Sequence, residues 1–180
     1  MCGRFAAELV SLARFTPYIH HVIKVATALR LADVFWPEFV QHAGCVFLSR
    51  EYTHAAVDLT SYEQLTLAET FVNHVHITDL FRHVIPGFEH AEHGYWVSDD
   101  THVDFARAWQ LGERLAQMWA AKLAADFSDR AFRVYLTRRD TPILRFHTMR
   151  LDEPSWLSEP EIARGVESGD LFALFVRASA

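Results

Sequence analysis

Two neighbouring segments in the C-terminal third of the chain alternate apolar and polar residues, and this alternation constrains the fold more than any other feature. Residues 131–137 and 143–149 have the period of two that is typical of half-buried strands, and Asp140 and Pro142 between them are typical turn residues. A one-residue slip would turn every side chain to the other face, so the two apolar faces coincide only if opposed residue numbers add up to an even value. The pattern therefore predicts an antiparallel hairpin with a connection of odd length.

The polar face of this predicted hairpin carries side chains that could bind an anion. Two guanidinium groups can hold a carboxylate or a phosphate bidentately, and a phenol and an imidazole beside them can add hydrogen bonds. The same residues would also suit the solvated side of an ordinary antiparallel sheet. The candidate ligand-binding residues are Arg133, Tyr135, Arg145 and His147.

Apolar residues at helical spacing predict three main helices, over residues 17–32, 61–75 and 99–127. The second has Thr60 and Glu63 at the spacing of a capping box. The third has one apolar stripe that includes Gly112, which indicates close contact with another element. Shorter helices are predicted over residues 5–15, 33–43 and 158–168.

The remaining segments complete an α+β prediction. All-apolar runs predict buried strands at Cys45–Leu48 and Leu171–Val176, residues 52–59 predict a further strand, and residues 82–98 read as a long loop. We expect a helix-rich α+β fold, with an antiparallel or mixed sheet of about four to five strands packed against the three main helices. No repeat or linker divides the sequence, so residues 1–180 are predicted to form a single globular domain.

Composition restricts the classes of partner. The chain has 51% hydrophobic and 22% charged residues and a formal net charge of −6, without a concentrated basic stretch, so electrostatics disfavours nucleic-acid binding. No apolar window has the length of a membrane span or the form of an export signal, and only Cys2 and Cys45 are present. We therefore expect a cytoplasmic protein without a membrane partner or a disulfide framework.

A surplus of aromatic residues favours association. Phe occurs 14 times and Trp five times, and the segments around Trp36, Phe39, Trp96 and Trp156 are candidates for exposed apolar contacts. The preferred prediction is a bacterial-type binding or regulatory protein that acts through protein–protein contacts as a homodimer, another homo-oligomer or with a protein partner.

Eleven histidines raise the alternative of a small metal-assisted enzyme of hydrolase type, using the histidine-rich residues 83–104. His90 and His93 would share one face of a helical turn, and Asp100 follows, so these three are the candidate ligands for a divalent metal such as zinc. His74 and His76 could meet only if their backbone were extended, because a spacing of two on a helix separates them. The histidines could also form a pH switch, since full protonation would change the formal charge from −6 to +5.

The first five residues, Met-Cys-Gly-Arg-Phe, resemble the start of the SRAP family, in which a cysteine at position two attacks abasic sites in DNA. The resemblance ends there: the Asn-Ala-Arg-x-Glu segment and the downstream histidine motif of that family have no counterpart in this sequence. Phosphate-binding Gly-rich loops, Gly-x-Ser-x-Gly elbows and Cys-x-x-Cys pairs do not occur either. The sequence thus carries no motif that identifies a reaction.

Overall fold

The computed structural model describes residues 24–55, 57–81, 85–89, 92 and 96–179. Contacts divide the chain into two units, Met1–Ala32 and Asp33–Ala180. The predicted helix over residues 5–15 lies outside the described residues, as does the start of the one over 17–32. The described part of the latter is helical as α2 (Val25–Phe35). That all 180 residues form one domain stays a prediction, and the description below concerns the second unit.

The second unit contains a four-stranded antiparallel sheet in the order β3-β7-β6-β8. Its strands are β3 (His74–His76), β7 (Pro142–Thr148), β6 (Phe132–Arg138) and β8 (Leu171–Val176). The predicted hairpin is confirmed, because β6 and β7 pair with Phe132 opposite Thr148 and are joined by residues 139–141, an odd-length connection. Helices and antiparallel strands together confirm the α+β class.

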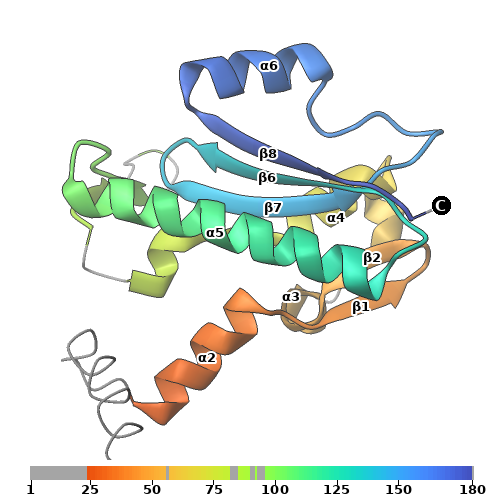
Figure 1. Cartoon of the computed structure of the whole chain (residues 1–180), viewed down its shortest axis with the longest axis horizontal. Helices are drawn as coiled ribbons and strands as arrows, with labels where there is room; N and C mark the ends of the chain where they lie inside the picture. The colour runs from red at the N-terminus through yellow and green to blue at the C-terminus, as the bar shows by residue number, and fades with distance from the viewer. Residues whose placement is uncertain (1–23, 56, 82–84, 90–91, 93–95, 180) are drawn as a thin grey trace, which may run out of the picture. The chain divides into compact units, whose positions relative to one another are not determined.

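Helix α5 (Val103–Asp126) runs along one face of this sheet and supplies much of the core (Figure 1). The predicted apolar stripe is buried, with Phe105, Leu115 and Trp119 almost inaccessible to solvent. Gly112 marks a close contact, since a Cβ atom there would lie 2.7 Å from Cδ1 of Leu136 on β6. The helix begins four residues later than predicted.

Helix α6 (Glu159–Ser168) covers part of the opposite face of the sheet, and Ile162 packs there against β6 and β8. Its predicted ends are confirmed: Ser158 and Glu161 form the capping box, and Gly169 ends the helix with a φ of 78°. A left-handed residue at this position suits glycine, which has no Cβ atom.

The prediction of a helix over residues 33–43 is wrong, because a separate hairpin begins within this segment. Strand β1 (Phe39–His42) pairs antiparallel with β2 (Cys45–Leu48). Ala43 and Gly44 both have positive φ, 47° and 84°, as a tight two-residue hairpin turn requires. Strand β2 is buried as predicted, but it belongs to this hairpin and not to the main sheet.

The segment after β2 also differs from prediction. Residues 49–55 form helix α3 (Ser49–Ala55), not a strand, and the short 3-10 turn η2 (Leu59–Ser61) follows. Helix α4 (Leu65–Val72) is shorter than predicted at both ends. The expected Thr60 and Glu63 capping box is not formed: the carboxylate of Glu153, distant in sequence, accepts hydrogen bonds from the backbone N–H groups of Leu65 and Thr66 at 3.0 and 2.7 Å.

The predicted long loop over residues 82–98 contains regular structure in its described part. A 3-10 turn, η3 (Ile77–Phe81), precedes it, and β4 (Gly87–Glu89) pairs antiparallel with β5 (Trp96–Ser98). Within the described residues, no helix has the length and apolar character that crossing a membrane requires.

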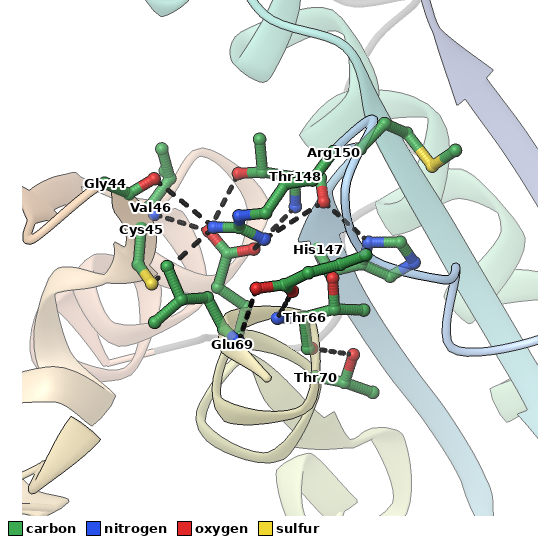
Figure 2. A network of polar contacts seen from close by, with 12 residues as sticks. Gly44, Cys45, Val46, Thr66, Glu69, Thr70, His147, Thr148 and Arg150 are labelled. Carbon is green, nitrogen blue, oxygen red and sulfur yellow. Dashed lines mark hydrogen bonds and ion pairs between the residues drawn. The ribbon is translucent and has the colours of Figure 1, made fainter. Parts of the chain in front are cut away.

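Helix α4 joins the β1–β2 hairpin to the main sheet through two buried polar side chains, Glu69 and Asn73 (Figure 2 shows Glu69). Glu69 Oε1 accepts from the Val46 N–H on β2 at 2.6 Å, and Glu69 Oε2 accepts from the Thr148 N–H at the end of β7 at 2.7 Å. The guanidinium of Arg150 donates to the same carboxylate at 2.8 Å. A single buried carboxylate thus accepts hydrogen bonds from two strands that do not pair with each other.

Asn73 makes the equivalent connection one helical turn later. Its Oδ1 accepts from the Leu48 N–H at 2.8 Å, and its Nδ2 donates to the Val46 carbonyl at 2.8 Å. Its own carbonyl accepts from the Phe146 N–H of β7 at 3.3 Å. Because Glu69 and Asn73 are four residues apart, they lie on one side of the helix end and satisfy the backbone of β2 along its length.

This anchoring predicts that Glu69→Ala lowers the free energy of unfolding by about 3 to 5 kcal/mol, because the largely buried Arg150 guanidinium and the Val46 and Thr148 amides lose their acceptor. Urea denaturation measures the change. Glu63→Ala removes an exposed carboxylate just before α4 and serves as the control, for which we expect little change. Equal effects of the two substitutions would contradict the anchoring role.

Candidate functional site

The four residues predicted as a ligand-binding set do lie on one face of the β6–β7 hairpin, where Arg133 is opposite His147 and Tyr135 is opposite Arg145. This face is not the solvated side of the sheet, since Tyr135 and His147 are fully buried. Trp156 and helix α6 cover it. Whether the four residues bind a ligand stays a prediction.

Three polar side chains meet at the centre of this face. Tyr135 Oη lies 2.9 Å from Ser155 Oγ, and both hydroxyl oxygens lie 3.2 Å from Nε2 of His147. The other ring nitrogen, Nδ1, lies 2.9 Å from the Thr148 carbonyl oxygen. A carbonyl oxygen only accepts, so Nδ1 carries the proton and Nε2 accepts from the hydroxyl groups.

Burial keeps this cluster neutral. It lowers the pKa of His147 and raises the pKa of Tyr135, so both side chains are uncharged near pH 7. The Ser155 and His147 pair has the residue types of a nucleophile and its base, yet none of the three residues lines either of the two clefts described below. The arrangement accounts for the packing of the covering loop against the sheet.

The two arginines of the set differ in their partners. Arg133 forms an ion pair with Glu159 at the start of α6 and lies 4.9 Å from the centre of the Phe175 ring. The guanidinium of Arg145 lies 4.6 Å from the centre of the Trp156 ring. Among the described residues, no carboxylate forms an ion pair with Arg145. Burial, together with the nearby Arg139, lowers the pKa of Arg145 to about 10.

The candidate metal ligands cannot be assessed as a set, because His90 and His93 lie outside the described residues. Asp100 is exposed, lies 3.7 Å from the Arg138 guanidinium and lines an open depression of about 570 Å³ with Asp99 and Asp140. Within the part of the chain that the structure describes, no three His, Cys, Asp or Glu residues are placed to hold a metal ion. The metal site stays a prediction.

The thiol of Cys45 is poorly suited to act as a nucleophile. Burial, and then the nearby Glu69 carboxylate, raises the pKa of its thiol to about 11. The thiolate form is the nucleophile, so this cysteine is inert at neutral pH.

A larger cleft of about 750 Å³ lies beside β3 and was not foreseen from the sequence. Three segments that are distant in sequence line it, together with Trp119 of α5. They are the end of α2 with the residues after it (33–38), the junction of β2 and α3 (48–51), and β3 with the turn that follows (74–80).

Hydrogen bonds hold the walls of this cleft in place. The Trp119 indole N–H donates to the Val34 carbonyl at 2.8 Å, and the Ser49 N–H donates to the Glu38 carbonyl at 2.9 Å. Leu48 is held by the side chain of Asn73, directly before β3. The cleft is therefore preformed by contacts within the second unit.

The cleft is acidic. Four carboxylates line it, against the single guanidinium of Arg50, and no ion pair involving any of them is found among the described residues. Burial lowers the pKa of His76, so its imidazole is neutral at pH 7 and does not offset them. The carboxylates are those of Asp33, Glu38, Glu51 and Asp79.

The histidines at 74 and 76 lie together here because β3 is extended. Their ring centroids are 5.3 Å apart, whereas a helix, as predicted over residues 61–75, would have separated them. Nδ1 of His74 donates to the Phe71 carbonyl at 2.5 Å, and Nδ1 of His76 lies 3.0 Å from Thr141 Oγ1. The spacing of two residues between His74 and His76 was the one signal in the sequence that could have located strand β3.

Strand β3 also presents backbone groups to the cleft side. The Phe146 N–H donates to the Asn73 carbonyl, so Asn73 and Phe146 form a hydrogen-bonded pair. Hydrogen-bonded and non-hydrogen-bonded pairs alternate along antiparallel strands, so the backbone N–H and C=O groups of Val75 point toward β7. Those of His74 and His76 point away from β7. Strand β3 is at the edge of the sheet. Its outer side can therefore pair with another extended chain.

The aromatic residues proposed for association differ in exposure. Trp36 is half exposed, Phe39 packs against the core and Trp156 packs against Tyr135. The side chain of Trp96 lies outside the described residues. Homodimerisation through this set stays a prediction.

The burial of neutral His147 generates a pH dependence. Because the folded pKa lies below the ordinary value of 6.5, the unfolded state binds the proton more tightly, and stability declines as the pH falls from about 6.5 to the folded pKa. We predict that His147→Gln makes this decline shallower in urea denaturation between pH 7 and pH 5. A substitution at the exposed His42 is the control, and an unchanged slope in His147→Gln would contradict the assignment.

Comparisons with known proteins do not supply a function. No protein-family model, curated protein or solved structure matches the chain. The case for a function therefore rests on the geometry of the cleft beside β3.

Proposed function

We propose that this protein is a non-enzymatic binding protein that holds an extended, positively charged segment of a partner protein in the acidic cleft beside β3. The observation that carries the proposal is the coincidence of a preformed cleft, four carboxylates without a described cationic partner, and an open strand edge in one place. The ligand would add to β3 as a further antiparallel or parallel strand.

Charge favours a basic ligand over an acidic or neutral one. The carboxylates of Glu38 and Asp79 come from two segments of the lining that are distant in sequence, so lysine or arginine side chains of a bound strand would find more than one partner in the cleft. Burial lowers the pKa of His76, so its ring adds no positive charge beside the strand near pH 7. Apolar lining from Val34, Leu80 and Trp119 would contact the other side chains of the segment.

The backbone supplies the second part of recognition. Two N–H and two C=O groups, those of His74 and His76, are directed to the outer side of β3 and would bond to the main chain of the ligand. Main-chain bonds give affinity without reading side chains, while the carboxylates select for positive charge. A small metal-assisted enzyme is the weaker candidate, because no observation on the described residues favours it.

Isothermal titration calorimetry with a short peptide of alternating lysine and threonine tests the proposal. We expect binding by the full chain, weakened about tenfold by the double substitution Glu38→Gln and Asp79→Asn, because each lost pair of exposed charges contributes roughly 0.2 to 1 kcal/mol. The matched control is Asp152→Asn with Glu167→Gln, which removes two exposed carboxylates outside the cleft and leaves the same net charge.

Two further peptides separate the parts of the mechanism. The same peptide with glutamate in place of lysine should not bind. The lysine peptide with N-methyl groups on alternate residues keeps its charge but loses the N–H donors of one edge, so it should bind less tightly. Equal binding to the cleft and control variants would show attraction to net charge alone and would contradict the proposal, as would failure of the lysine peptide to bind.

A further inference from the structure

Strand β8 forms the other edge of the main sheet, far in the strand order from the cleft beside β3. It runs Leu-Phe-Ala-Leu-Phe-Val without a proline or a charge. Exposed edges of this kind are usually protected by lysine, proline or a bulge, because they pair readily with other chains. Strand β8 has neither a lysine nor a proline.

The free backbone groups of β8 follow from its register. The Arg138 N–H donates to the Asp170 carbonyl at 2.7 Å, so these two residues form a hydrogen-bonded pair. Such pairs alternate with non-hydrogen-bonded pairs along antiparallel strands, so the backbone groups of Phe172, Leu174 and Val176 bond to β6. The N–H and C=O groups of the three residues between point away from the sheet: Leu171, Ala173 and Phe175. No hydrogen bond to these outward groups is found within the described part of the chain.

These outward groups are complementary to themselves. If two copies of β8 run antiparallel with Ala173 opposite Ala173, then Leu171 of one copy is opposite Phe175 of the other, and all three residues fall on hydrogen-bonded pairs. A two-fold axis through Ala173 relates the halves, as an isologous dimer requires. Phe175, which is 47% exposed, would gain Leu171 of the second copy as its cross-strand neighbour.

Charges at the two ends of β8 match the same register. Asp170 directly precedes the strand and Arg177 directly follows it. In the antiparallel pairing, Arg177 of each copy comes beside Gly169 and Asp170 of the other, so opposite charges meet at both ends. A parallel pairing would place like charges together. The charges therefore favour one orientation and a second copy as the occupant.

We propose that a second copy of this chain pairs antiparallel with β8 about Ala173, so that two four-stranded sheets join into one continuous sheet. This inference is independent of the ligand in the cleft, because β3 and β8 are opposite edges. It also places the dimer contact on a strand and not on the aromatic segments around Trp36 and Trp156.

Disulfide trapping tests the register. In a Cys2→Ser background, Ala173→Cys brings two thiols to one hydrogen-bonded pair, with Cα atoms about 5.5 Å apart, within the disulfide range. Phe175→Cys is the matched control, because in this register its two copies lie about four residues, roughly 13 Å, apart and cannot be bridged. We expect a covalent dimer on a non-reducing gel under mild oxidation for Ala173→Cys alone. Equal crosslinking of both variants, or of neither, would overturn the register.

Light scattering tests the dimer without crosslinking. The full chain should give twice the 20.7 kDa mass of one copy at micromolar concentration. Ala173→Pro removes an outward N–H and leaves the bonds to β6, so the variant should be a monomer with an unchanged circular dichroism spectrum. Arg177→Asp should weaken the dimer, and adding Asp170→Arg should restore it. A monomeric full chain, or a folded Ala173→Pro variant that stays dimeric, would overturn the proposal.

Discussion

The buried carboxylate of Glu69 is the interaction on which the architecture of the second unit depends. It accepts hydrogen bonds from β2, from the end of β7 and from Arg150, and with Asn73 it connects a two-stranded hairpin to a four-stranded sheet that does not pair with it. The backbone donors belong to buried residues and the Arg150 side chain is only 11% exposed, so the cost of leaving these donors unpaired makes the arrangement specific. The same connection brings Leu48 alongside β3 and so forms the cleft, which makes the proposed binding site a consequence of the anchoring.

Local patterns in the sequence predicted the elements whose structure depends on local contacts. The alternation over residues 131–149 predicted both strands and the parity of their pairing, because only one parity buries Phe132, Val134 and Phe146 together. The stripe along α5 and the close approach at Gly112 follow from helical periodicity alone. The ends of α6 follow from Ser158, Glu161 and Gly169, whose roles are set within the helix itself. The same parity predicted that the candidate anion-binding residues share one face of the hairpin. It did not predict that Tyr135 and His147 on this face are buried.

The elements that the sequence did not predict depend on partners distant along the chain. Helix α4 begins at Leu65 because Glu153 supplies its cap, and it ends where Asn73 turns to bond β2 and β7. Neither partner can be recognised from neighbouring residues, so the helical pattern was extended through His74 in error. The Ala43–Gly44 turn lacks the usual Asn-Gly signal, which hid the β1–β2 hairpin. The cleft needs three such segments to be placed correctly, so no single motif could reveal it.

The central claim is that β3 offers its outer edge to a basic strand in the acidic cleft. Hydrogen exchange measured by NMR on the full chain, with and without the alternating lysine and threonine peptide, tests it at single residues. The backbone register predicts that the peptide slows exchange of the His74 and His76 amides, which face outward, and leaves the Val75 amide, already bonded to β7, unchanged. Unchanged exchange at His74 and His76 in the presence of bound peptide would contradict the account.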